Sequence, residues 1–523
     1  MYNKNSVLKL NKNTIKRYEC NFDNGVFFLF NAVTKKHWTG NNAAYAILKL
    51  INGKRTLDEI YTEAKIIFED FSNEEIADSI NPILSEWISE KFINVIEPNE
   101  SENDTTNNWL NKNLEECIET CMDFHFNPPR KENSPIDEFK QLHIKTTESE
   151  LKKDERYYFR DPLNVKLIIE SNCNLRCKHC YFHGKPEIYN SENNTPKEKI
   201  FEAIDVLADK FSCYFMTIAG GEPFLRDDIL EILEYIKSKN IAVYIQTNGT
   251  LLTNKIIDKL ETILNLNTDI IQISIDGLSD KSHEKIRGKN AFNKSINVLT
   301  ELAKRDFITA VNCTALSENV YELPKIYEFL RDLKVRKMSF GKFDLKFDKQ
   351  SYLIPDEDIL FKAAAEIIRL NREDDFQGLN LGLFENIELI NNKKTVKYVD
   401  KYLSESNNIA QNEDLGCAYH SGFCINSEGS VHLCPEVYSI CKEFIMGNIK
   451  NDSLVDIWEK RLDNLFFQPR MRDKMLCKKC KYVDLCRGGC PAKAYAKYGD
   501  KHMPDPECRI GAEIVKKNKS IKK

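Results

Sequence analysis

The sequence predicts an α/β protein made of a small helical module, a large parallel sheet and a cysteine-rich region. Three observations support this. Residues 1–97 place helices between two strands, residues 161–345 alternate buried strands with helices, and cysteines crowd into residues 416–512. Six βα units in the middle part imply a parallel sheet, either doubly wound or curled into a partial barrel.

Composition limits the classes of protein that remain. The chain has 523 residues, 17 cysteines and a formal net charge of −5. We expect no membrane span, because no apolar run reaches about 18 residues. No secretory signal follows Met1, so we expect a cytoplasmic, reducing location in which C-x2-C spacings favour metal over disulfides. The charge gives no reason to expect nucleic acid as a partner.

The first part, residues 1–97, is predicted to run strand, helix, helix, helix, strand. Gly53 ends the first helix, and Thr56 with Glu59 forms a capping box at the start of the second. The predicted strands are residues 26–31 and 92–96, and the predicted helices are residues 42–51, 56–68 and 73–90.

Two connecting stretches flank the sheet. Residues 98–160 form a proline-containing linker with one amphipathic stretch, on which Cys117 and Cys121 share an apolar face. Packed core thiols are the preferred interpretation of this pair, and a third metal site is the alternative. Residues 346–415 contain one predicted helix, 356–370, and residues 513–523 are a basic tail.

The sheet region begins near residue 161. Its apolar runs have the length of strands that are buried on both faces. The predicted strands are residues 165–169, 215–219, 242–246, 270–275, 309–314 and 337–340. The predicted helices are residues 198–210, 227–239, 254–264, 291–305 and 322–333.

Three cysteines, Cys173, Cys177 and Cys180, directly follow the first of these strands. Parallel α/β folds place their active sites at this end of the strands. Three thiolates on one loop can hold three irons of a [4Fe–4S] cube and leave the fourth iron open to a small molecule. Taken alone, the triplet could also be a zinc or disulfide motif.

The segment 173–181 resembles the C-x3-C-x2-C loop of the radical S-adenosylmethionine (SAM) enzymes, whose cluster binds SAM through its open iron. Other motifs fall in that family's order, so the resemblance implies a partial (β/α)6 TIM-like barrel. Gly220, Gly221, Glu222 and Pro223 resemble the segment that holds the SAM amino group. The resemblance implies further SAM contacts at Ser274, Arg287 and Asn312.

The cysteines of residues 416–512 resemble the SPASM domain, which houses two auxiliary [4Fe–4S] clusters. Gly429 stands where that domain has a hairpin turn between ligands. The resemblance implies one cluster on Cys417, Cys424, Cys434 and Cys490, and another on Cys477, Cys480, Cys486 and Cys508. Three clusters would give about twelve irons per chain, whereas a pair of zinc knuckles is the alternative for the same spacings.

Residues 1–97 resemble the PqqD-like precursor-recognition element, a winged-helix-like module that binds the leader of a ribosomally made peptide. Such modules bind by β-augmentation, in which the leader adds a strand to a sheet edge. A winged helix that binds DNA is the alternative. The acidic residues of the second helix, including Asp58, Glu59 and Glu63, disfavour it.

Together these resemblances imply a radical SAM peptide maturase that forms cysteine thioether cross-links through a 5′-deoxyadenosyl radical. They also imply an electron donor such as flavodoxin or ferredoxin. Formylglycine formation is one alternative, but those enzymes carry an Asp where this chain has Pro435, and Glu436 is the residue that remains as a candidate base. Epimerisation, carbon–carbon cross-linking and a non-catalytic cluster scaffold stay open as further alternatives.

Overall fold

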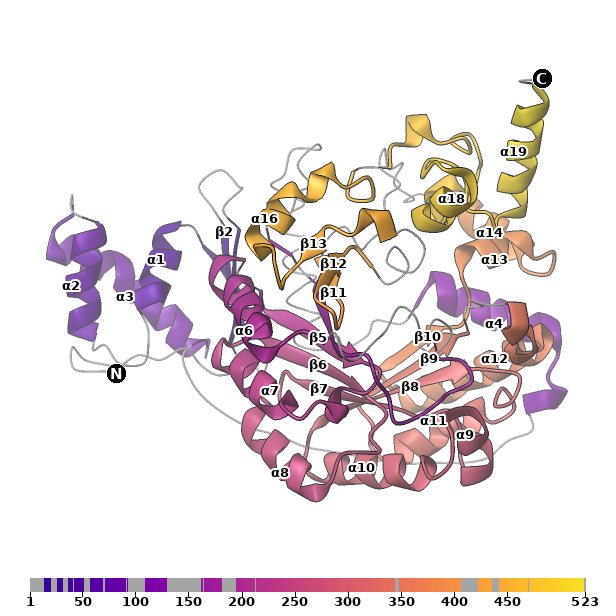
Figure 1. The fold of residues 1–523 in the computed structure, drawn as a ribbon, viewed down its shortest axis with the longest axis horizontal. Coiled ribbons are helices and arrows are strands. Elements are labelled where there is room, and N and C mark those ends of the chain that lie inside the picture. The colour runs from indigo at the N-terminus through magenta and orange to yellow at the C-terminus, as the bar shows by residue number, and fades with distance from the viewer. Residues whose placement is uncertain are drawn as a thin grey trace.

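The computed structural model shows a small N-terminal module, a large sheet lined on one side by helices, and a C-terminal domain on the other side of the sheet (Figure 1). It describes residues 14–19, 26–31, 36–40, 42–50, 57–68, 71–90, 92, 109–128, 161–162, 164–180, 194–211, 213–343, 348–405, 422–434, 442–468 and 470–521.

The N-terminal module has a hydrophobic core of its own, separate from the core around the large sheet. Its helices bury residues at helical spacing, such as Ile76, Ile80, Leu84 and Trp87 on α3. The strands are β1 (Thr14–Glu19), β2 (Val26–Asn31) and β3 (His37–Gly40), and the helices are α1 (Asn42–Leu50), α2 (Leu57–Ile67) and α3 (Asn73–Ser89).

The predicted order of this module was wrong at its start. One strand was expected before the helices, but β2 lies in the middle of an antiparallel sheet with the order β1-β2-β3. The two additional strands are held by pairing with β2, a tertiary effect that local composition does not reveal. Of the strand expected at residues 92–96, Phe92 lies in a turn and the rest is outside the described residues.

The six predicted strands of the middle part are present as parallel neighbours in chain order, which confirms the partial-barrel fold. They are β4 (Asn164–Glu170), β5 (Phe215–Gly220), β6 (Ala242–Thr247), β7 (Ile270–Ser274), β8 (Ile308–Ala315) and β9 (Lys337–Lys342).

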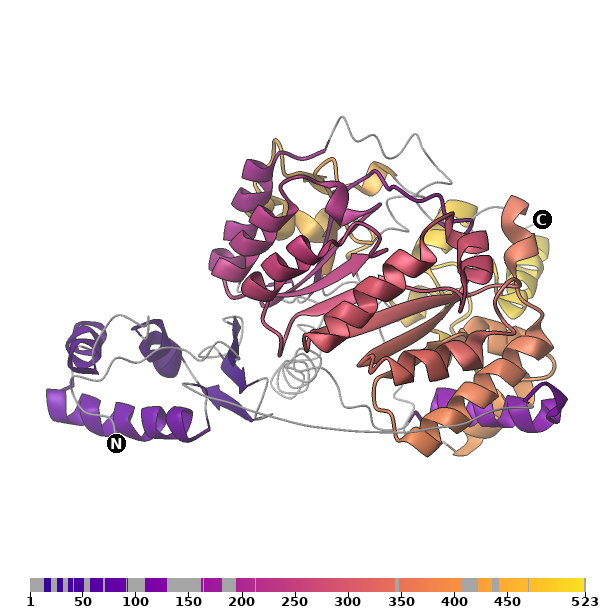
Figure 2. The same ribbon diagram turned by 90° about the horizontal axis from the view of Figure 1, so that it is seen from below.

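Helices cover the outer face of these strands (Figure 2). The five predicted segments are helical, and the first continues as a π-helical turn at Val206–Lys210. Helix α9 was not predicted, because its sequence DKSHEKIR has little apolar periodicity. The helices are α6 (Lys197–Asp205), α7 (Ile229–Ser238), α8 (Asn254–Ile263), α9 (Asp280–Arg287), α10 (Phe292–Lys304) and α11 (Leu323–Asp332).

Four further strands extend the sheet at both edges, to ten strands in total. At one edge β10 (Leu379–Gly382) runs parallel to β9. At the other, β11 (Gly422–Ile425) pairs parallel with β4, and β12 (Ser430–His432) and β13 (Gly447–Asn448) follow antiparallel. The cysteine-rich region is therefore joined to the barrel through a shared sheet.

The connecting segments are packed rather than loose. Helix α4 (Leu114–Phe126) lies against α12 (Glu357–Asp374), and Cys121 Sγ contacts Phe361 O at 3.4 Å. Cys117 and Cys121 both belong to the main core, as preferred from the sequence. The amphipathic stretch expected within the linker of residues 98–160 is thus helical and packed on α12. The 3₁₀ turn Trp109–Asn111 precedes it, and α13 (Asn386–Asn391) and α14 (Val396–Glu405) follow α12.

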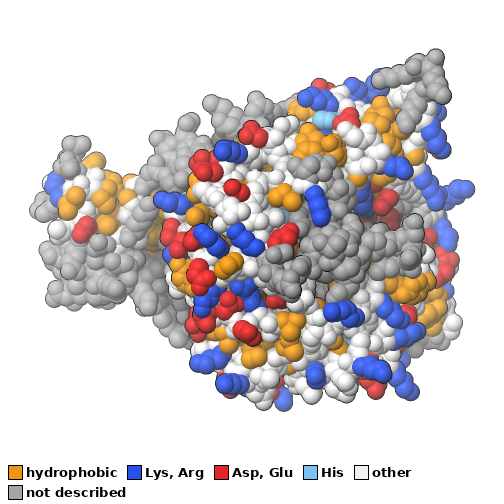
Figure 3. Space-filling model, viewed as in Figure 1, with side chains coloured by type: hydrophobic (Ala, Val, Ile, Leu, Met, Phe, Trp, Pro, Cys, Tyr) orange, Lys and Arg blue, Asp and Glu red, His pale blue; other side chains and the backbone are white. Residues whose placement is uncertain are grey.

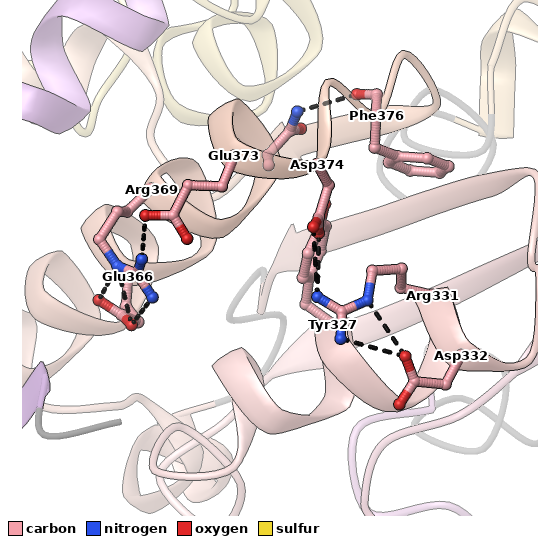
Figure 4. Close-up of polar contacts among 9 residues, drawn as sticks. Tyr327, Arg331, Asp332, Glu366, Arg369, Glu373, Asp374 and Phe376 are labelled. Carbon is pink, nitrogen blue, oxygen red and sulfur yellow. Dashed lines mark hydrogen bonds and ion pairs between the residues drawn. The ribbon is translucent and has the colours of Figure 1, made fainter. Parts of the chain in front are cut away.

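Polar contacts fix the far end of α12 to α11 (Figure 4). Tyr327 donates a hydrogen bond to Asp374 at 3.1 Å, and Arg331 pairs with the same carboxylate at 3.2 Å. Along α12, Arg369 pairs with both Glu366 and Glu373. The C-terminal end of α12 is therefore fixed to α11, and the Arg369 pairs support α12 itself.

The C-terminal domain contains α16 (Leu454–Glu459), α17 (Val483–Cys486), α18 (Pro491–Tyr498) and α19 (Arg509–Ile521). The predicted basic tail is corrected here, because residues 513–521 continue α19. Gly511, Ile514 and Val515 are at least partly buried, which explains why the helix continues. No described helix is long and apolar enough to cross a membrane. On the described part of the face in Figure 3, charges of both signs are interspersed.

Candidate iron–sulfur and SAM site

The loop that carries Cys173, Cys177 and Cys180 leaves the C-terminal end of β4. The three thiols lie within electrostatic range of one another. Burial raises the pKa of Cys177 to about 12 and also raises that of Cys173. Metal ligation would have to displace these protons, as it does in other thiolate sites. The donor set therefore fits three irons of one cube.

The Gly-Gly-Glu-Pro segment braces this loop through its backbone. Gly221 N donates to Glu170 O and Glu222 N donates to Asn172 O, each at 2.8 Å. A Cβ on Gly221 would lie 2.2 Å from Asn172 O, so no other residue fits there without moving the loop. The proposed contact of this segment with the SAM amino group stays a prediction.

Glu222 links the ends of β5 and β6. Its carboxylate is fully buried and accepts hydrogen bonds from Thr247 Oγ1 at 2.6 Å, Asn248 N at 2.8 Å and Phe224 N at 3.1 Å. Burial raises the pKa of Glu222 despite these donors. The bond to Asn248 matters for the loop, because Asn248 Nδ2 lies 3.0 Å from Asn174 Oδ1 and 3.7 Å from Cys173 Sγ.

A buried ion pair between Arg287 and Asp276 lies next to the cysteine loop. Arg287 Nε is 2.6 Å from Asp276 Oδ2, and His179 Nε2 is 3.6 Å from the same oxygen. Burial would raise the pKa of Asp276, but Arg287 and His179 outweigh it, so this pKa is lowered. Arg287 was expected to contact SAM. Its Nε bonds to Asp276 instead, and any SAM contact stays a prediction.

Helix α9 contacts the cysteine loop through its last carbonyl groups. Lys178 N donates to Ile286 O at 2.9 Å, and Cys177 Sγ lies 3.8 Å from Arg287 O. Because Arg287 is bonded to Asp276 at the end of β7, the loop, the helix and the strand are fixed together.

The other residues expected to bind SAM lie on neighbouring strands. Ser274 and Asn312 are opposite each other in the parallel register of β7 and β8, and both are half-buried. Side chains of such a pair point to the same face of the sheet. Their roles stay predictions.

In the C-terminal domain the structure brings together four of the predicted ligands, Cys477, Cys480, Cys486 and Cys508. Each lies within electrostatic range of others in the set. Burial raises the pKa of Cys477 to about 11 and that of Cys486 to about 12. Four free thiols, that of Cys477 buried and the other three partly buried, fit a fully ligated cube.

The other auxiliary set is described only in part. Cys424 lies on β11 and is opposite Lys166 of β4 on one side and His432 of β12 on the other. The predicted hairpin turn is confirmed at Gly429, whose φ is +89°. Cys490 begins α18, and its N–H donates to Asp505 Oδ2 at 2.8 Å. Cys417 and the candidate base Glu436 lie outside the described residues.

All 14 cysteines in the described ranges are free thiols. Within those ranges, no three His, Cys, Asp or Glu side chains converge closely enough for a single metal ion. A cube takes one thiolate per iron, so its ligands surround a whole cluster and do not share one ion.

Two family models match the chain. Residues 167–330 match the radical SAM superfamily, and residues 417–487 match the SPASM iron–sulfur cluster-binding domain. The fold, the site and these matches thus define an iron–sulfur enzyme with a radical SAM domain. More particularly, the chain combines this domain with a SPASM domain.

Known relatives are distant. The Fe-coproporphyrin III synthase of Methanosarcina barkeri is 25% identical over 66% of this chain and 86% of that protein. The mycofactocin maturase MftC of Mycolicibacterium smegmatis is 25% identical over 65% of this chain and 80% of that protein. Streptococcus suis SuiB, in a crystal structure bound to its precursor peptide SuiA, superposes with a TM-score of 0.60 at 14% identity, over 96% of this chain and 100% of that chain. This last likeness establishes a shared fold.

Sequence reasoning missed several residues that hold the site together, among them Asn248, Asp276, Asp505 and Arg470. Asn248 and Asp276 directly follow predicted strands, where active-site residues gather, and that position was the available signal. Asp505 and Arg470 gave no local signal, because their partners lie 15 to 33 residues away along the chain.

Proposed function

We propose that this enzyme forms thioether cross-links in a ribosomally synthesised precursor peptide. The observation that carries the proposal is the extent of the likeness to SuiB. The superposition spans 96% of this chain, so it includes most of the barrel, the SPASM domain and the N-terminal module. SuiB was crystallised with a precursor peptide, so a shared arrangement of all three parts supports a shared class of substrate.

The N-terminal module offers an edge for the leader of such a peptide. In the described sheet β3 is an edge strand and pairs with β2 alone. Asn31 N donates to Lys36 O at 2.9 Å, and bonded pairs alternate along an antiparallel ladder. Trp38 and Gly40 therefore bond to β2, whereas His37 and Thr39 direct their N–H and C=O groups outward. A leader strand would bind there by β-augmentation.

The side chain of Trp38 anchors the edge strand β3 to helix α3. Its ring packs edge-on against Trp87 of α3, with centroids 5.1 Å apart, and its Nε1 donates to Glu86 Oε2 at 2.9 Å. These contacts hold β3 against α3. The leader strand would meet a rigid edge, which reduces the entropy lost on binding.

When bound, the cluster and SAM would supply a 5′-deoxyadenosyl radical able to remove a hydrogen atom from the peptide. The protein's part is to hold and to position. Cys173, Cys177 and Cys180 would ligate the cluster, while the Gly221 and Glu222 backbone fixes their loop. Ser274 and Asn312, at the open end of the barrel, would orient SAM and exclude water from it.

Thioether formation leaves one proton and one electron to be removed. A cysteine S–H bond and a C–H bond of the peptide break, a C–S bond forms, and one hydrogen atom leaves with 5′-deoxyadenosine. Glu436 would take the proton, and an auxiliary cluster would take the electron. A ferredoxin or flavodoxin would supply the electron that cleaves SAM.

A second candidate substrate is an iron porphyrin, because the relatives include an Fe-coproporphyrin III synthase. The two candidates are separated by anaerobic co-expression with a short cysteine-rich peptide encoded beside this protein. A peptide lighter by about 2 Da per link, from the loss of two hydrogens, supports the proposal. An unmodified peptide, with formation of Fe-coproporphyrin III from an iron tetrapyrrole by the purified enzyme, would overturn it.

A further inference from the structure

Arg470 is buried among the cysteines of the C-terminal domain. Its side chain is 1% exposed, although arginine is rarely buried to this extent. Five of its hydrogen bonds, 2.7 to 3.3 Å long, go to backbone carbonyl oxygens. The acceptors are the carbonyl groups of Arg487, Gly488, Gly489, Lys501 and Met503.

These carbonyl groups belong to two segments that lead to cluster ligands. Residues 487–489 separate Cys486 from Cys490, and residues 501–503 precede Cys508. Arg487, Gly488 and Gly489 have φ values of 52°, 74° and 73°, a left-handed run that two glycines make possible. A Cβ on Gly488 would lie 2.3 Å from Met475 Cε and 3.3 Å from Arg470 Nη1. The turn is thus folded closely around the guanidinium.

The guanidinium also lies within electrostatic range of three thiols, those of Cys477, Cys486 and Cys490. Burial lowers the pKa of Arg470, while these thiols and the nearby Asp505 carboxyl raise it, and an arginine stays protonated in proteins. A buried cation is costly unless negative charge lies close to it. Asp505 supplies one such charge, and ligation of Cys477 and Cys486 as thiolates would add to it.

We propose that Arg470 is a positioning residue that raises the reduction potential of the cluster on Cys477, Cys480, Cys486 and Cys508. The inference rests on the proposed function, in which an auxiliary cluster accepts one electron from the peptide. Net charge and hydrogen bonding near the sulfurs set the potential of such clusters. A fixed positive charge beside two ligands favours the reduced state, which carries one more negative charge.

The test is a redox titration of the reconstituted full-length protein, monitored by electron paramagnetic resonance. A background with Cys173, Cys177 and Cys180 replaced by Ala removes the SAM cluster and its signal. In this background we compare Arg470→Gln, which removes the charge, with Arg470→Lys, which keeps it. Arg461→Gln is the control, because Arg461 lies over the Trp458 ring at 4.4 Å.

We expect Arg470→Gln to disfavour one-electron reduction of the cluster about tenfold, which is a fall of about 59 mV in its midpoint potential. Arg470→Lys and Arg461→Gln should keep the original potential. If Arg470→Gln loses the cluster's iron, Arg470→Lys decides: full iron at the original potential supports the proposal. Loss of iron or a lowered potential in Arg470→Lys overturns it, as does an unchanged potential in Arg470→Gln. The titration uses no peptide, so a failure of the proposed peptide chemistry would leave its result unaffected.

Discussion

Arg287 Nε lies 2.6 Å from Asp276 Oδ2, and both side chains are buried beside the loop that carries Cys173, Cys177 and Cys180. Asp276 also accepts a hydrogen bond from Thr314 N at 2.8 Å, so the pair joins β7, β8 and α9. Because the last carbonyl groups of α9 contact the loop, the Arg287–Asp276 pair helps to position the three cysteines.

Asp276→Asn should therefore destabilise the barrel strongly. The amide can still accept from Thr314 N, but Arg287 is left as a buried charge without its carboxylate, which costs about 3–5 kcal/mol. We expect chemical denaturation to show this loss, together with less iron on the SAM cluster. Asp332→Asn is the matched control, because the Asp332 side chain is 51% exposed and its pair with Arg331 is expected to contribute about 1 kcal/mol or less. Equal losses in the two variants would contradict this role for Asp276.

Gly221→Ala should displace the cysteine loop. The new Cβ would meet Asn172 O at 2.2 Å, a backbone atom that cannot move without shifting Cys173. We expect anaerobic reconstitution to yield about eight irons per chain instead of about twelve. Gly341→Ala on β9 is the control, since a Cβ there meets nothing within 4 Å, and it should keep the full count. Full iron in Gly221→Ala would show that the loop tolerates the clash.

Elements of the fold and site that depend on nearby residues in the sequence could be predicted, whereas those that depend on distant residues could not. Strands β4–β9 were predicted to within about two residues, because strands buried on both faces are continuous apolar runs. The cysteine ligand sets stay predictions from spacing and resemblance. Strands β10 and β11 were missed, since each has four residues and exists through pairing with β9 or β4. Arg470 acts on segments 17 to 33 residues away, so no local pattern marks it, whereas Asp276 is marked only by its position after a predicted strand.

Thr39→Pro should weaken leader binding without disturbing the fold of the module. Proline removes the N–H of Thr39, which points away from β2, and so removes one donor from the edge that the leader would join. We expect an affinity loss of about tenfold, equivalent to about 1.4 kcal/mol, in fluorescence anisotropy with a labelled leader peptide. Thr39→Ala keeps the N–H and should bind as the original does. Equal binding by both variants would exclude this edge as the site.

Cys424→Ala addresses the fourth ligand of the first auxiliary cluster. If Cys424 is a ligand, loss of that cluster lowers the iron content from about twelve to about eight per chain. Cys213→Ala is the control, because Cys213 is a buried thiol that contacts Phe215 O and is not a predicted ligand. An unchanged iron content in Cys424→Ala would leave one iron of that cluster open to a substrate thiolate.

The central claim is that the enzyme links residues of a peptide. The most direct test is one anaerobic reaction of the reconstituted enzyme with SAM, a reductant and the precursor peptide, analysed for both peptide mass and 5′-deoxyadenosine. The account predicts a loss of about 2 Da for each link, with at least about one 5′-deoxyadenosine formed per link. Formation of 5′-deoxyadenosine with no change in peptide mass would contradict it.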